Sequence, residues 1–91
     1  MAALRLRIRG RVQGVGYRLA FFEQARALEL RGWVRNYSDG SVEAGVAGPD
    51  AVLAEICAWA NRGPATARVD AVDILPCADD SAPGFRIAET D

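Results

Sequence analysis

Histidine is absent from this chain, and cysteine occurs only at Cys57 and Cys77. The two cysteines form no CxxC pair, so a zinc site would lack enough nitrogen and sulfur ligands. We therefore predict no metal site. We interpret the cysteines as reduced structural thiols rather than as a disulfide, as is usual in a reducing compartment.

A strong excess of one charge is also missing, because 11 basic residues stand against 12 acidic ones. A pI near 5.4 argues against a general polyanion binder, since affinity for nucleic acid comes mainly from neutralising phosphates. A long hydrophobic run is missing too. Arginines interrupt the opening MAALRLRIRG, which excludes a signal-peptide core or a membrane span there. We expect a cytoplasmic protein that has no membrane or nucleic-acid partner.

The composition that is present is typical of one folded domain over residues 1–91, since 51% of the residues are hydrophobic and 25% are charged. Apolar and charged residues alternate in LRLRIR at 4–9, which predicts a half-buried strand. Phe21, Phe22, Ala25 and Leu28 follow the spacing of an amphipathic helix. Alternation and turn residues predict the other elements: strands at 33–36, 41–47, 68–75 and 85–87, and a helix at 50–62.

The order of these elements is βαββαβ, with a short edge strand added at the end. This is the order of the ferredoxin-like α+β sandwich, in which two helices cover one face of an antiparallel sheet of four to five strands. The alternation in the fourth strand slips between Asp70 and Val72, which predicts either a bulge or an ambiguous register.

The segment GRVQGVGYR, residues 10–18, joins the first strand to the first helix. Glycines allow close approach of a ligand, and successive N–H groups leading into a helix N-terminus form an anion cradle. Arg18 adds a forked, permanently charged donor that suits phosphoryl oxygens. The segment matches neither a P-loop nor GxGxxG. From these residues alone, a phosphate pocket and a glycine turn with a solvated arginine are equally good readings.

Three blocks resemble the acylphosphatase family: VQGVGYR at 12–18, GWVRN at 32–36 and DGSVE at 39–43. The resemblance implies an enzyme without a cofactor that hydrolyses acyl phosphates to a carboxylate and inorganic phosphate. It assigns phosphate binding to Arg18 and orientation of the attacking water to Asn36. It also implies a phosphate-binding loop made of Gln13, Gly14, Val15, Gly16, Tyr17 and Arg18.

The residue types suit that reaction. The leaving carboxylate has a conjugate acid with a pKa near ~4, so it departs without a general acid, and a chain without histidine suffices. The remaining tasks are positioning and electrostatic stabilisation. The loop contains no Cys or Ser nucleophile, which favours direct attack by water, with a phosphoryl oxygen of the substrate taking its proton.

Two other functions remain open at this point: a phosphate-sensing module without turnover, and a nucleic-acid-binding ferredoxin-like domain that uses the row Arg5, Arg7 and Arg9. We favour a solvated charged face for this row, paired with Glu43 and with Asp70 or Asp73 across the strands. We expect Trp33 and Trp59 to pack rather than bind substrate. Tyr17 has two interpretations, packing and lining the entrance for the acyl group, and we give packing at least equal weight.

Glu29 stands in LEL where the acylphosphatase family usually has LGL. We therefore expect a residue with a Cβ at a left-handed helix end, which costs ~1 kcal/mol. We expect a monomer.

Overall fold

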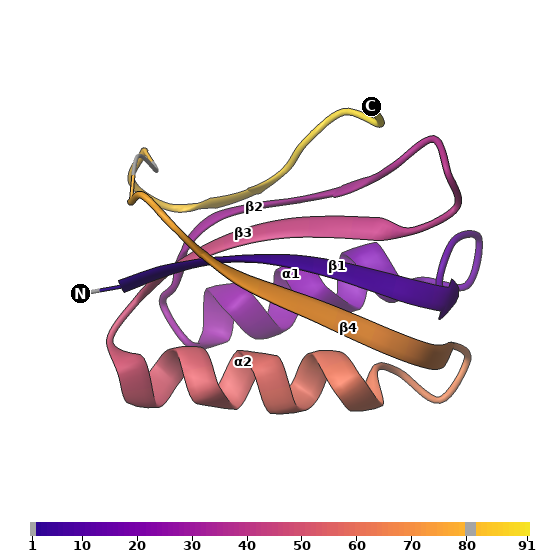
Figure 1. Ribbon diagram of the computed structural model, residues 1–91, viewed down its shortest axis with the longest axis horizontal. Helices are drawn as coiled ribbons and strands as arrows, with labels where there is room; N and C mark the ends of the chain where they lie inside the picture. Colours follow the sequence, from indigo (N-terminus) through magenta and orange to yellow (C-terminus); the bar gives the residue numbers. More distant parts are fainter. Residues whose placement is uncertain (1, 80–81) are drawn as a thin grey trace.

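The computed structural model describes residues 2–79 and 82–91, which form two layers, a sheet and a pair of helices (Figure 1). All seven predicted elements are present. Their bounds are β1 Ala2–Arg11, α1 Tyr17–Ala27, β2 Arg31–Asn36, β3 Val42–Gly48, α2 Asp50–Arg62, β4 Arg68–Cys77 and β5 Phe85–Ile87. Among the described residues, no helix is both long and apolar enough to cross a membrane.

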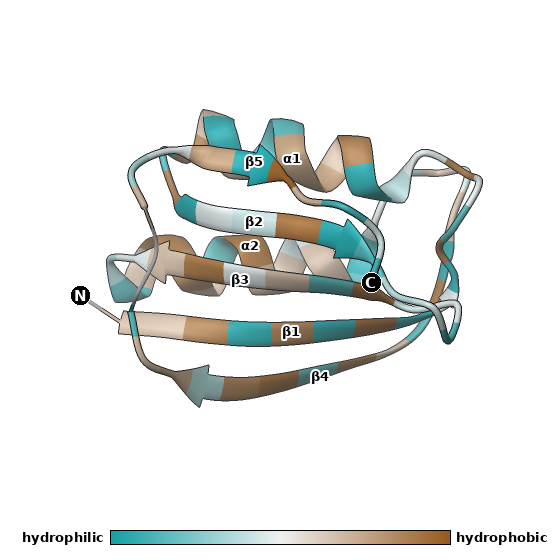
Figure 2. Cartoon of the chain, turned by 90° about the horizontal axis from the view of Figure 1, so that it is seen from above, coloured by the Kyte–Doolittle hydropathy of each residue, from teal (hydrophilic) through white to brown (hydrophobic). Residues whose placement is uncertain are grey.

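The strand order in the sheet is β4-β1-β3-β2-β5, seen from above in Figure 2. The first four strands pair antiparallel, as predicted. β5 differs from the prediction, because it pairs parallel with β2. The reason is topological: β4 runs opposite to β2 at the far edge, so a chain that reverses after β4 and reaches the other edge runs in the same direction as β2.

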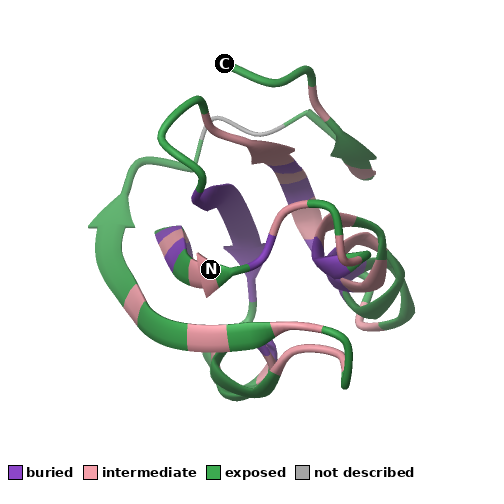
Figure 3. Cartoon of the chain, turned by 90° about the vertical axis from the view of Figure 1, so that its right-hand side faces the viewer, coloured by how far each residue is buried: buried purple, intermediate pink, exposed green. Residues whose placement is uncertain are grey.

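Both helices lie on one face of the sheet and cover its apolar side chains (Figure 1). In β1, Leu6 and Ile8 are buried while Arg5 and Arg9 are exposed, which confirms the predicted alternation. β3 lies in the centre and is buried throughout, whereas the edge strand β4 is largely exposed (Figure 3). The core therefore consists of the apolar side chains on the covered face of the sheet and those on the facing sides of α1 and α2.

The predicted bulge lies at Asp70. Arg9 pairs with Ala71 and Gly10 with Val69, so Asp70 has no opposite residue on β1. The extra residue explains the slip in the hydrophobic pattern, since one inserted position reverses which face the following side chains occupy.

β1 and β2 both run antiparallel to β3 and therefore run in the same direction, two positions apart in the sheet. Their C-terminal ends lie at the same end of the sheet (Figure 1). The loop that follows β1 and the last residue of β2, Asn36, are brought together in this way. This arrangement places the candidate site.

Candidate active site

The loop between β1 and α1 contains two glycines in the left-handed region, Gly14 with φ +74° and Gly16 with φ +84°. A Cβ at either position would meet no atom within 4 Å, so the conformation and not the space calls for glycine. Gly16 is also the N-cap of α1, which has no side-chain cap and no acidic residue in its first turn. The positive end of the helix dipole is therefore open to an anion.

A hollow of about 340 Å³ lies between this loop and the end of β2, and its lining includes Gly14, Gly16, Arg18 and Asn36. The structure thus brings together the two predicted catalytic residues, which are 18 positions apart in the sequence. Asn36 Oδ1 is buried and accepts no hydrogen bond from any described residue. A buried amide oxygen without a partner is a vacant acceptor, which suits the binding of a water molecule.

Tyr17 borders the hollow but is 0% exposed. Its hydroxyl donates a hydrogen bond of 2.9 Å to the carbonyl of Ala60 in α2, and its ring lies 5.5 Å from that of Trp59. Burial raises the pKa of Tyr17 above its ordinary value. Of the two readings of Tyr17, packing is therefore the one that the structure supports, and the side chain anchors the start of α1 against α2.

Gln13 is not among the described residues that line the hollow, and its side chain contacts the turn after β2. Its Nε2 donates hydrogen bonds of 2.8 Å to the carbonyls of Tyr37 and Ser41 in the turn after β2. The carbonyl of Val15 accepts a hydrogen bond of 2.5 Å from the hydroxyl of Thr66. The loop is thus held from two sides. These contacts use the side chain of Gln13 and the carbonyl of Val15, so they do not occupy the backbone amides that the predicted phosphate cradle needs.

Sequence reasoning assigned no role at the site to Leu19 and Ile87, yet both line the hollow. They are 54% and 41% exposed, so they give the hollow an accessible apolar part. The position of Leu19 directly after Arg18 was an available signal. No local signal pointed to Ile87, because only the pairing of β5 with β2 brings it to the site.

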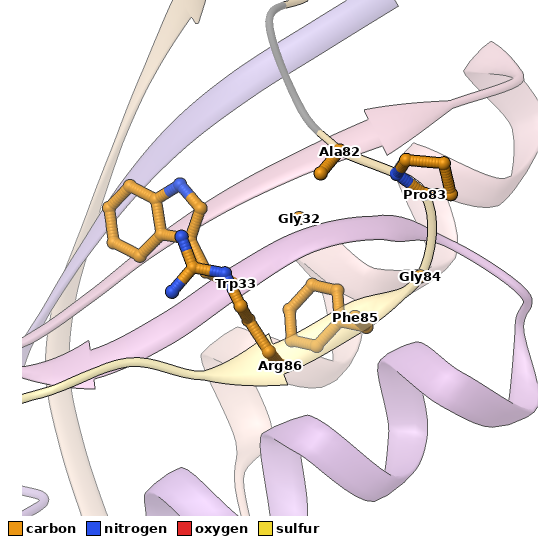
Figure 4. Close-up of a pocket in the computed structure, with 7 residues that line it drawn as sticks. All are labelled: Gly32, Trp33, Ala82, Pro83, Gly84, Phe85 and Arg86. Atoms are coloured by element: carbon orange, nitrogen blue, oxygen red, sulfur yellow. The ribbon is translucent and has the colours of Figure 1, made fainter.

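A larger hollow of about 390 Å³ lies at the start of β2, around Trp33 and Phe85 (Figure 4). Arg86 extends from β5 toward the Trp33 indole, and it is the only ionisable side chain among the described residues that line this hollow. The hollow therefore lacks the pairing of a cation with a polar water-binding group that marks the smaller one.

The face of the sheet opposite the helices carries the arginine row, which forms ion pairs. Glu43 lies 3.0 Å from Arg7, 2.6 Å from Arg35 and 3.6 Å from Arg5, and Arg9 lies 3.2 Å from Asp73. The predicted partner Asp70 instead pairs with Arg68. Asp39 also pairs with Arg7 and Arg9, and Asp91 pairs with Arg35. Four arginines therefore face four carboxylates, and this network carries no excess of the positive charge on which nucleic-acid binding depends.

Glu43 departs from the predicted solvated face, because it is only 4% exposed. Burial acts to raise the pKa of its carboxyl, but the hydrogen bonds from Arg35 and Arg7 outweigh it and hold the pKa below the ordinary value. Arg35, which sequence analysis did not include in this cluster, is therefore one of its main members.

No group of three His, Cys, Asp or Glu side chains that could hold a metal ion occurs within residues 2–79 and 82–91. Neither Cys57, which is half-buried, nor Cys77, which is exposed, forms a disulfide. Burial raises the pKa of the Cys57 thiol. Neither thiol is among the residues that line the hollow.

Comparison with known proteins identifies this arrangement, because the profile of the acylphosphatase family matches residues 4–87. The chain belongs to the acylphosphatase family. It is 49% identical over 85 residues to the acylphosphatase of Azoarcus sp. (strain BH72), covering 93% of this chain and 87% of that one. It is 48% identical over 84 residues to acylphosphatase 2 of Ralstonia nicotianae, covering 91% and 88%.

The fold agrees with this assignment. The crystal structure of acylphosphatase from Bacillus subtilis superposes with a TM-score of 0.91 at 30% identity, covering 97% of this chain and 99% of that one. The predicted ferredoxin-like fold and enzyme class are therefore confirmed, and neither the sensing module nor the nucleic-acid-binding domain is favoured.

Proposed function

We propose that this chain hydrolyses acyl phosphates to a carboxylate and inorganic phosphate in the hollow at the ends of β1 and β2. The observation that carries the proposal is that Arg18, the glycine loop and Asn36 line one hollow. The family membership supports the same reaction.

The phosphoryl group binds to the backbone amides of residues 13–17 and to Arg18. The amides and the N-terminus of α1 supply fixed positive partial charges, and the guanidinium of Arg18 donates to two phosphoryl oxygens at once. Charge that spreads over the equatorial oxygens in the transition state is stabilised by these donors. Arg18 is the only charged group among the described residues that line the hollow, so it sets the charge preference of the site.

The attacking water binds to Asn36. Its vacant Oδ1 accepts a hydrogen bond from the water and turns a lone pair of the water oxygen toward phosphorus. The new P–O bond forms as the bond to the carboxylate oxygen breaks, and the departing carboxylate keeps the electron pair. A proton of the water passes to a phosphoryl oxygen. Asn36 keeps the same charge throughout, so it orients the water and does not act as a base.

The finer features belong to the same proposal. Residues 1–91 act as a single domain and as a monomer in the cytoplasm, and the reaction needs neither a metal nor another cofactor. The physical support is that one arginine, one asparagine and backbone amides supply all the groups that the displacement of a good leaving group uses.

The test is hydrolysis of benzoyl phosphate by the purified protein in EDTA, with Arg18→Gln and Asn36→Ala as variants. We expect each variant to lose about 10²-fold or more in kcat/KM, the usual cost of removing one group that stabilises or orients the transition state. The matched controls are Arg26→Gln and Asn61→Ala, which alter exposed positions on the helices. Both controls keep the activity of the unaltered protein.

Circular dichroism and urea unfolding confirm that each variant is folded. If the unaltered protein binds phosphate but does not turn over, the sensing module replaces the enzyme. If EDTA abolishes turnover and a divalent metal restores it, the metal-free mechanism is wrong.

A further inference from the structure

The loop at 12–16 and Asn36 both line the hollow, and Asn36 is directly followed by the turn at 37–41, so two segments bear on the site: this loop and this turn. The two segments lie at the same end of the sheet (Figure 1). Their relative position sets the distance from the bound phosphorus to the water held by Asn36. In-line attack needs that distance near ~3–3.5 Å, so whatever joins the two segments controls the rate of the chemical step.

The ladder between β1 and β3 ends before the loop at 12–16 begins. Val42 pairs with Ile8 on one side and with Asn36 on the other, and no pairing of β1 with β3 continues beyond it. Within residues 2–79 and 82–91, the hydrogen bonds between the two segments are those of the Gln13 side chain.

Gln13 binds the two carbonyls that close the turn. The carbonyl of Tyr37 accepts from the amide of Gly40 at 3.1 Å, and the carbonyl of Ser41 accepts from the amide of Tyr37 at 2.9 Å. Each of these carbonyls also accepts a 2.8 Å hydrogen bond from Gln13 Nε2. A carboxamide has two N–H donors and a carbonyl has two lone pairs, so this arrangement uses both donors and both second lone pairs.

The geometry points to Gln13 as a positioning residue, whose side chain sets the place of Asn36 relative to the phosphate cradle. This inference rests on the proposed function. Its backbone amide lies in the cradle, but its side chain acts on the turn. Replacing the side chain therefore disturbs the orientation of water more than the binding of phosphate, a separation that loss of general stability does not produce.

The test uses Gln13→Met, which keeps the length of the side chain and removes both donors. We expect kcat for benzoyl phosphate to fall about 10- to 100-fold, the range for a misplaced reacting group. The inhibition constant of inorganic phosphate changes by less than about threefold, because the cradle is intact. Gln24→Met makes the same chemical change at an exposed position of α1 and leaves both quantities unaltered.

A second measurement combines Gln13→Met with Asn36→Ala. If Gln13 acts through Asn36, the double variant keeps a kcat within about twofold of Asn36→Ala alone, because the pair is coupled. Thr66→Val removes a hydrogen bond from the same loop without touching the turn, and its effect multiplies with that of Asn36→Ala. Gln13→Asn, which is too short to reach both carbonyls, replaces Gln13→Met if that variant does not fold.

Three results would overturn the inference. The first is a phosphate inhibition constant that rises in step with the loss of kcat, which would place the Gln13 side chain in the cradle. The second is a loss of kcat on Gln13→Met that is the same with and without Asn36, which would make Gln13 a structural residue. The third is an unaltered kcat in Gln13→Met, which would show that the sheet alone positions Asn36. An unaltered protein that does not turn over overturns the proposed function and the inference with it, and is recognised before any variant is compared.

Discussion

Glu29 follows α1 with a φ of +56°, and it is the only residue other than glycine with a positive φ among those described. Two hydrogen bonds of 3.0 Å end the helix: the amide of Leu30 donates to the carbonyl of Ala25, and the amide of Glu29 donates to the carbonyl of Arg26. This pair of hydrogen bonds is the Schellman motif, whose left-handed position favours glycine. The strain expected from the LEL sequence is therefore present in the structure.

Replacing Glu29 by glycine stabilises the protein. Because Glu29 is exposed, its replacement removes backbone strain and leaves the packing intact, and the free energy of unfolding rises by about 0.5–1 kcal/mol. Urea unfolding at neutral pH measures this change. Glu23→Gly, at an exposed position inside the same helix, lowers the free energy of unfolding by about 0.5–1 kcal/mol. A loss of stability in both variants would contradict the prediction.

At the scale of the element, the start of α1 is the feature that matters for function. Gly14 and Gly16 turn the backbone so that the loop passes directly into the helix, and the packing of Tyr17 on α2 fixes the direction of the helix. The first turn has no acidic side chain that would compete with an anionic ligand. In the proposed mechanism this element therefore binds phosphate through its backbone, and Arg18 through its side chain.

Gly16→Ala tests this reading. Alanine at a φ of +84° is strained, and relief of that strain shifts the loop amides, so the inhibition constant of phosphate rises about tenfold or more. Gly84 is the matched control, since its φ is +86° and a Cβ there also meets no atom within 4 Å. Gly84→Ala loses the same ~1 kcal/mol of stability but keeps phosphate binding. Equal phosphate inhibition constants in the two variants would show that the loop amides do not form the cradle.

At the scale of the whole molecule, the two faces of the sheet have different tasks. One face holds the helices and the core, and the other holds ion pairs around Glu43, in an alternation visible along β1 in Figure 2. Arg7 also lies 4.2 Å from the centre of the Tyr37 ring, so the charged face reaches the turn that follows Asn36. This face therefore contacts the turn next to the proposed site.

The charged face makes stability depend on pH. Burial opposes ionisation of Glu43, but its hydrogen bonds with Arg35 and Arg7 keep its pKa below 4.5, so the folded protein binds fewer protons than the unfolded chain. The pKa of Asp39 is lowered in the same direction, mainly by hydrogen bonds from Ser41. The stabilisation is therefore complete above about pH 4.5 and is lost as the pH falls through the lowered pKa values.

Glu43→Gln tests this dependence by urea unfolding between pH 3 and 7. The variant is less stable by about 1–3 kcal/mol at neutral pH, because a charged acceptor of several hydrogen bonds is lost, and its stability declines less on acidification. Asp73→Asn removes an exposed partner of Arg9 and changes stability by less than about 0.5 kcal/mol. Parallel pH curves for Glu43→Gln and the unaltered protein would show that Glu43 does not control the acid limit.

The sequence by itself determined the element order, the bulge at Asp70, the strain at Glu29 and the presence of Arg18 and Asn36 in recognisable motifs. These features depend on local backbone geometry and on side-chain periodicity, both of which operate over a few residues.

Only the tertiary structure decided the parallel pairing of β5, the burial of Glu43, the packing of Tyr17, the contacts of Gln13 with the turn and the place of Ile87 at the site. Each of these joins residues far apart in the chain. The physical reason is that strand order and direction decide which distant side chains meet, and neither is encoded in any short segment.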